Sequence, residues 1–145
     1  PVATRIRFGE GARRDPTPID LSPGFSPGDA GQQTNSTIEA VKGREGYVAL
    51  ARRQLVPPGA WRLDYEVETG LAWKGRLVID IALDGEAVAA ARIPTGAPGA
   101  RQGALSFESG AKGLFGGGLE CRLWADGKTG VRLIAARMTP LEGVV

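Results

Sequence analysis

The sequence predicts an all-β protein, an antiparallel two-sheet β-sandwich with about nine strands and little or no helix. Three observations support this prediction. The 22 glycines and 10 prolines are spread along the chain, and no amphipathic run of helical period lasts beyond about two turns. Short segments of alternating apolar and polar residues recur instead, with turn residues about every 8 to 12 positions. The length of 145 residues suits a single domain with one hydrophobic core.

The strand pattern recurs from the first residues to the last. The segments that carry it are residues 4–8, 37–42, 46–55, 60–68, 75–83, 86–93, 103–108, 119–125 and 130–138. A tight turn is expected at 57–59, where Pro-Pro-Gly combines a fixed φ with a residue that accepts positive φ. The chain begins at Pro1, which is typical of a mature form or of a domain excised from a longer protein.

Residues 9–37 differ from the rest of the chain, because they are rich in proline and glycine and otherwise mostly polar or small. We expect a long loop here that is ordered by its contacts with the sandwich. One short strand is expected near residues 18–21, and Ile19, Leu21 and Phe25 are the apolar residues that would anchor the loop.

The Asp-Gly pair at 84–85 predicts a hairpin between its two flanking strands. A two-residue loop would force Arg92 into the core. A three-residue loop with the glycine as its bulge pairs Ile81 with Ala87 and turns Arg92 outward, so we expect that register.

The second Asp-Gly pair, at 126–127, predicts a similar hairpin that places strand 119–125 beside strand 130–138 and pairs Cys121 with Val131. Alternation along the two hairpins and along strand 60–68 then defines one sandwich core. Its expected members are Trp61, Leu63, Tyr65, Val67, Leu77, Ile79, Ile81, Ala87, Ala89, Ala91, Leu119, Cys121, Leu123, Val131 and Leu133.

Composition excludes several classes of function. The 18 Lys and Arg residues against 16 Asp and Glu leave a net charge of +2 scattered along the chain, so nucleic-acid binding is not expected. No apolar run is long enough to insert in a membrane, and no targeting signal identifies a compartment. The absence of histidine removes Ser-His-Asp and Cys-His catalysis and His-ligated zinc. The one cysteine, Cys121, is expected to be a small buried hydrophobe.

Trp124 is the residue that best suggests a function, because it occupies the outward, polar register of strand 119–125. Glu120 and Arg122 share its face, and the hairpin register adds Arg132 and Ile134 on the neighbouring strand. Three alternatives stay open for the indole ring. Residues 9–37 cover it, another domain or subunit covers it, or it is an exposed platform for a sugar.

A sugar platform needs a flat apolar surface for the C–H face of a pyranose and nearby polar groups that bind its hydroxyls. Aromatic residues near loops and outward Arg or Gln side chains fit this chemistry. The predicted ligand-binding residues are therefore Trp124, Arg122, Trp73, Tyr47, Gln102 and Arg132.

The carboxylates do not predict catalysis. Asp64 and Glu66 lie two residues apart on one outward strand face, and nothing in the sequence buries them, so we expect a solvated surface rather than a catalytic pair. No cofactor is predicted. A structural calcium ion is kept as an alternative, although the acidic residues do not have the spacing of an EF-hand. Its candidate oxygen ligands are Asp15, Asp20, Asp29 and Asp126.

One stretch resembles a known family. Leu55, the turn at 58–59 and the alternating Trp61, Leu63 and Tyr65 follow a pattern of the galactose-binding-like β-sandwiches, the jelly-roll fold of many carbohydrate-binding modules. The similarity extends over residues 37–142. It implies a jelly-roll-like sandwich that binds a ligand or partner without catalysis, as an accessory module of a larger protein.

Two functional hypotheses follow. The first is a non-catalytic carbohydrate-binding module that recognises a glycan through exposed aromatic and Arg side chains. The alternative is a structural or protein-interaction sandwich from a multidomain envelope, secretion or virion protein, with Trp124 against a neighbouring element. A small polysaccharide-cleaving enzyme is a third option, and it would require an exposed cleft with two carboxylates and a raised pKa.

Overall fold

A computed structural model describes residues 17–54, 56–70, 75–83, 85–95, 97–109 and 118–141. The described residues form eleven strands and one short 3-10 turn. The strands are β1 Ile19–Asp20, β2 Phe25–Pro27, β3 Gly31–Thr34, β4 Thr37–Ala40, β5 Gly46–Gln54, β6 Gly59–Thr69, β7 Leu77–Leu83, β8 Glu86–Ile93, β9 Gly99–Ser109, β10 Leu119–Ala125 and β11 Val131–Pro140. None of these residues forms a helix with the length and apolar character that a membrane crossing needs.

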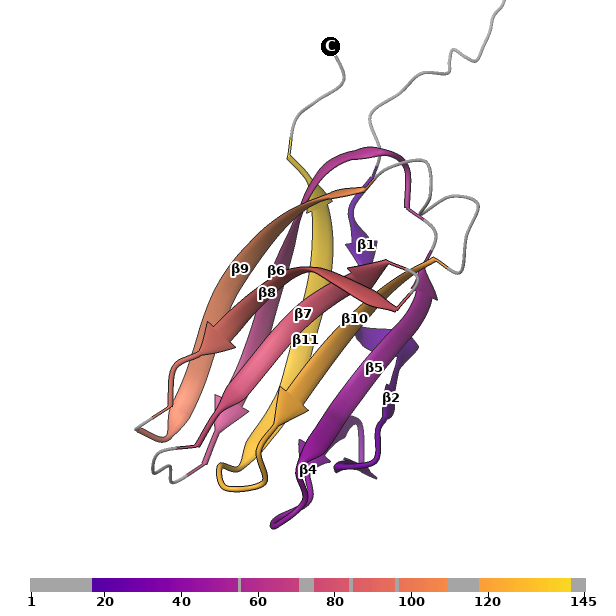
Figure 1. The fold of residues 1–145 in the computed structure, drawn as a ribbon. Coiled ribbons are helices and arrows are strands. Elements are labelled where there is room, and N and C mark those ends of the chain that lie inside the picture. The colour runs from indigo at the N-terminus through magenta and orange to yellow at the C-terminus, as the bar shows by residue number, and fades with distance from the viewer. Residues whose placement is uncertain are drawn as a thin grey trace, which may run out of the picture.

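Two antiparallel sheets pack face to face, which confirms the predicted all-β sandwich. One sheet has the order β3-β4-β11-β6-β9, with β1 also paired to β11, and the other has the order β2-β5-β10-β7-β8. Figure 1 shows β5, β10, β7 and β8 as one layer and β11, β6 and β9 as the other. Apart from the β3–β4 and β7–β8 hairpins, consecutive strands of the described chain belong to opposite sheets.

The core lies between the sheets and consists of residues that alternate along the long strands. Strand β6 has a strict pattern in which every second residue from Trp61 to Thr69 is buried. The indole N–H of Trp61 donates to the carbonyl oxygen of Pro57 at 2.9 Å, so this large side chain is buried without an unpaired donor. The expected core is confirmed except at Ala87, which is exposed, and at Ala89 and Ala91, which are partly buried.

The hairpin register predicted at β7–β8 is wrong, although Arg92 does face outward. Leu83 pairs with Glu86 across a two-residue loop, and Ile81 pairs with Ala89 rather than with Ala87. The ladder shifts between Ile81 and Ala82, so one extra residue bulges out of β8. This bulge restores the alternation that a simple two-residue loop would have reversed.

The predicted β10–β11 hairpin is also wrong, because the two strands belong to different sheets. Cys121 pairs with Ala51 and Ile81 instead of Val131. The loop after β10 is hydrogen-bonded to the segment before β7, since one Asp126 carboxylate oxygen accepts the backbone N–H of Arg76 at 2.8 Å. The chain therefore leaves the sheet at Asp126 and does not fold back beside β10.

Residues 17–37 contain more strand than the sequence predicts. The short strand expected near residues 18–21 is β1, and Leu21 and Phe25 are buried as anchors. In addition, β2 extends one sheet beyond β5, and β3 pairs with β4. The polar and glycine-rich composition hid these edge strands, which hydrogen-bond through their backbones with few apolar side chains.

Gly31 packs against the backbone of β5. A Cβ atom at this position would collide with the Val48 carbonyl oxygen, and that backbone atom is held within the sheet. We expect Gly31→Ala to lower the free energy of unfolding by about 1–3 kcal/mol because of this overpacking. Gly70→Ala is the matched control, since its added Cβ would lie 3.8 Å from the nearest atom, Gly130 Cα, and should change stability by less than about 0.5 kcal/mol. Urea denaturation measures both, and equal effects would contradict the packing argument.

Cys121 is a fully buried residue on the inner face of β10. Burial raises the pKa of its thiol well above the ordinary value, and the nearby charge of Asp80 adds to the effect. We expect no reaction with a thiol reagent at mildly alkaline pH in the native chain and full reaction in denaturant, because only the thiolate is nucleophilic. Rapid labelling of the folded chain would show that this part of the sheet opens.

Candidate functional site

The outer face of the five-stranded sheet carries Arg122 and Trp124 in two rows of side chains that cross the strands. Cross-strand partners share a face, so the register of the ladder defines each row. The first row is Arg92, Val78, Trp124 and Tyr47, and the second is Ala90, Asp80, Arg122 and Leu50. We call this surface the aromatic–arginine face. It brings together three of the six predicted ligand-binding residues, namely Tyr47, Arg122 and Trp124.

Arg122 is held rigidly at the centre of this face. Its Nε and Nη2 atoms donate to the two carboxylate oxygens of Asp80 at 2.8 and 2.9 Å, and each side chain is only 14% exposed. The guanidinium also lies over the Tyr47 ring, with Cζ 5.0 Å from the ring centroid. The hydrogen bonds to Asp80 raise the pKa of Arg122 against the opposing effect of burial.

Trp124 is half-buried, and Arg76 covers its ring. The Cζ atom of Arg76 lies 5.0 Å from the indole centroid. The backbone of Arg76 is fixed by Asp126, which accepts its N–H at 2.8 Å and donates its own N–H to the Arg76 carbonyl at 3.1 Å. Within residues 17–37, β2 lies beyond β5, and β1 and β3 belong to the other sheet. Among the described residues, the cover over the Trp124 ring is therefore Arg76, which immediately precedes β7.

Arg132 does not join this face, which corrects the prediction. It lies on β11, in the other sheet, and forms an exposed ion pair with Glu68. The sequence placed it beside Trp124 because the β10–β11 hairpin was assumed. The true neighbours of β10 are β5 and β7, and β7 supplies Asp80 and Val78.

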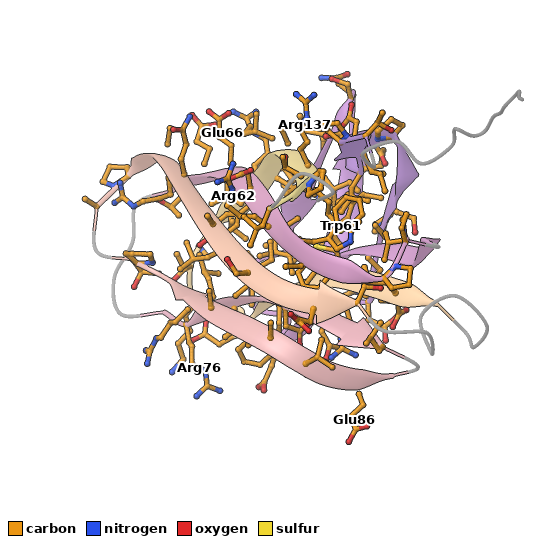
Figure 2. All side chains as sticks on the ribbon, turned by 90° about the horizontal axis from the view of Figure 1, so that it is seen from above. Trp61, Arg62, Glu66, Arg76, Glu86 and Arg137 are labelled. Carbon is orange, nitrogen blue, oxygen red and sulfur yellow. The ribbon has the colours of Figure 1, made fainter. Side chains whose placement is uncertain are left out.

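Gln102 also lies on the outer face of the six-stranded sheet, on β9 opposite Glu66. It borders a shallow hollow of about 320 Å³ that Asp64, Glu66 and Arg137 also line. Figure 2 shows Glu66 and Arg137 on the side of the sandwich opposite Arg76. Asp64 pairs with Arg62 on its own strand at 3.0 Å, and both side chains are more than 40% exposed, in agreement with the predicted solvated face.

The remaining expectations concern Trp73 and the calcium ligands. Trp73 and Asp15 lie outside the described residues. Both oxygens of Asp126 accept backbone N–H groups, from Arg76 and Lys128, and one oxygen of Asp20 accepts the N–H of Ser22. In the described part of the chain, no three acidic or cysteine side chains gather as a metal site would require.

Sequence reasoning missed Arg76, Asp80 and Arg92 as members of this face. The sequence did contain a signal for Asp80. Asp80 faces outward on its strand, and Arg122, which has the opposite charge, faces outward on β10. Opposite charges in the outward registers of two strands indicate that the strands are neighbours. Arg76 has the same outward register in the predicted strand 75–83, but Trp124 carries no charge that would mark the two residues as partners.

The fold is shared with solved structures, whereas the sequence is not. No family model and no curated protein matches this chain. A cyclase from Fischerella sp. TAU, solved in complex with 4-(1H-indol-3-yl)butan-2-one, has a TM-score of 0.54 at 14% identity over 81% of this chain and 73% of its own. The Stig cyclase Fisc from the same organism has a TM-score of 0.52 at 14% identity over 88% and 87% of the two chains. These identities establish a common sandwich fold and nothing further.

Carbohydrate-binding modules are also among the similar solved structures. The module CBM6cm-2 of Cellvibrio mixtus lichenase 5A, solved with cellotriose, has a TM-score of 0.48 at 14% identity and covers 88% of this chain and 99% of its own. The jelly-roll-like architecture itself is evident from the two sheets and from the strands that alternate between them.

The Arg122–Asp80 pair should contribute measurably to stability. We expect Asp80→Asn to lower the free energy of unfolding by about 1–3 kcal/mol, because it leaves a largely buried guanidinium without its carboxylate. Asp64→Asn removes the carboxylate from the exposed Arg62 pair and should cost less than about 1 kcal/mol. Chemical denaturation of both variants compares the two pairs directly. A cost as large for Asp64→Asn would contradict the role assigned to burial.

Proposed function

We propose that this chain is a non-catalytic carbohydrate-binding module that holds a glycan on the aromatic–arginine face. The observation that carries the proposal is the pairing of Trp124 with Tyr47 across β10 and β5, directly beside a rigid Arg122–Asp80 pair. Aromatic rings suit the C–H faces of pyranoses, and positioned polar groups suit their hydroxyls.

The polar groups on this face are ordered before any ligand arrives. A guanidinium carries five N–H donors, and the two hydrogen bonds to Asp80 leave three for a ligand. The stacking on Tyr47 further restricts Arg122. Side chains that are already immobile lose little entropy on binding, which favours recognition of a flexible ligand such as an oligosaccharide.

The same face supports binding better than catalysis. Glycoside hydrolysis uses two carboxyl groups, one of which donates a proton to the leaving oxygen. Both oxygens of Asp80 already accept hydrogen bonds from Arg122. This arrangement suits a carboxylate that positions a guanidinium, so we treat the module as non-catalytic.

A second candidate function is docking of another protein domain on this face. The observation that favours it is the residue content, because Trp, Tyr and Arg are the residue types enriched at the centres of protein interfaces. Both candidates use the same side chains, so they differ in the ligand rather than in the site.

A glycan array probed with the 145-residue chain tests the proposed function. Trp124→Ala should weaken binding to the recognised glycan about tenfold or more, since the loss of a central aromatic contact costs more than about 1 kcal/mol. Arg137→Gln, on the opposite face of the sandwich, is the control and should bind as the parent chain does.

Thermal unfolding must first show that both variants remain folded. Recognition of no glycan by the parent chain would refute the proposal and favour docking of a protein. Loss of glycan binding in Arg137→Gln with retention in Trp124→Ala would move the site to the other sheet.

A further inference from the structure

Three arginines lie on or directly beside the aromatic–arginine face, and among the described residues only Arg122 forms a side-chain ion pair with a carboxylate. Arg122 pairs with Asp80 through two hydrogen bonds. Arg92 is exposed at the end of the first row, across Val78 from Trp124, and no carboxylate among the described residues pairs with it. Arg76 comes two residues before Val78 and packs on the Trp124 ring.

The opposite face of the sandwich has a different charge pattern. On that face, Arg62 forms an ion pair with Asp64, and Arg132 forms an ion pair with Glu68. Arg137 pairs in register with both Asp64 and Asp20, and its charge contributes to the lowered pKa of Asp20, after hydrogen bonds from Ser22. These arginines on the outer surface of the six-stranded sheet therefore lie beside carboxylates, whereas Arg76 and Arg92 form no side-chain ion pair with a described carboxylate.

Glu120 is the carboxylate of β10, and it lies at the far end of the face. It pairs in register with Ala82, four residues along β7 from Val78. At about 3.4 Å per residue, this places it roughly 14 Å along the strand from the row that holds Arg92 and Trp124. Glu120 is closest to the already paired Arg122 and does not balance the arginines at the other end.

The position of Arg76 suits an anion. Its guanidinium lies over the Trp124 ring, with Cζ 5.0 Å from the centroid, and a guanidinium carries its N–H donors in its plane. Those donors match the two oxygens of a carboxylate or sulfate in a bidentate hydrogen bond. Because the backbone of Arg76 is fixed by Asp126, its side chain starts from one defined place beside Trp124.

We infer that the glycan recognised here is acidic, and that Arg76 and Arg92, which both lie close to Val78, bind its carboxylate or sulfate groups. This inference rests on the proposed function and specifies its ligand class. The sugar rings lie along the row of Trp124 and Tyr47, and the acidic groups lie toward the β7–β8 side of the sheet.

An array of glycans printed in matched acidic and neutral forms tests the inference. Suitable pairs are uronic-acid oligomers with their methyl esters, and sulfated oligosaccharides with their desulfated forms. The acidic member of the recognised pair should bind about tenfold or more tightly than its neutral partner, because one charge-assisted contact accounts for more than about 1 kcal/mol. Added salt should weaken the acidic form more than the neutral form.

The variants Arg76→Gln and Arg92→Gln should each remove most of the preference for the acidic form while leaving the neutral form bound. Arg137→Gln is the matched control, because it makes the same substitution on the other face and should retain the preference. If Arg137→Gln reduces the preference as much as Arg76→Gln does, diffuse charge attraction explains it and the inference is wrong.

The remaining outcomes separate the inference from the proposed function. Equal binding of acidic and neutral forms, lost in Trp124→Ala, would overturn the inference and leave the carbohydrate-binding function standing. Recognition of no glycan would overturn both. In that case, binding of an acidic polyglutamate peptide that requires Arg76 and Arg92 would identify the face as a dock for an acidic protein segment.

Discussion

The link between Asp126 and Arg76 closes the β10–β7 ladder at the end that carries Trp124. The Asp126 carboxylate accepts the backbone N–H of Arg76 at 2.8 Å, and the backbone N–H of Asp126 donates to the Arg76 carbonyl at 3.1 Å. These two hydrogen bonds join the end of β10 to the start of β7. The chain then crosses to the opposite sheet as β11. Because β7 lies beside β10, Asp80 meets Arg122 and Arg76 reaches Trp124. The candidate site therefore depends on the contact between β7 and β10.

The two outer faces use similar residue types with different physical results. On the six-stranded sheet, Arg62 and Asp64 are more than 40% exposed, so water competes for their charges and the pair contributes little. On the five-stranded sheet, Arg122 and Asp80 are 14% exposed and flanked by Tyr47, which shields the pair and orders it. The second arrangement retains a defined geometry that a ligand can recognise, whereas the first provides a solvated polar surface.

Alternation along each strand was enough to predict the class of fold and most of the core, because burial depends only on which face a side chain occupies. It could not identify neighbouring strands. Cys121 and Leu133 are buried as expected although their strands lie in different sheets, and Arg132 was placed beside Trp124 by the same missing information. The error at Ala87 has another cause, a bulge in β8 that follows no simple sequence pattern. Trp124 and Arg122 were predicted from local sequence, whereas Arg76 required the three-dimensional junction.

The arginine that covers Trp124 changes what the indole ring offers to a ligand. A bare ring would present its whole face to a sugar, but the guanidinium of Arg76 lies over part of this surface. A neutral sugar that stacks on the ring must displace that guanidinium and lose the cation–π contact, whereas an acidic sugar gains a hydrogen-bonding partner already in place. The same contact therefore opposes one ligand class and assists the other. Specificity depends on such a difference between competing ligands, so the cover on Trp124 is the feature from which selectivity at this face would arise.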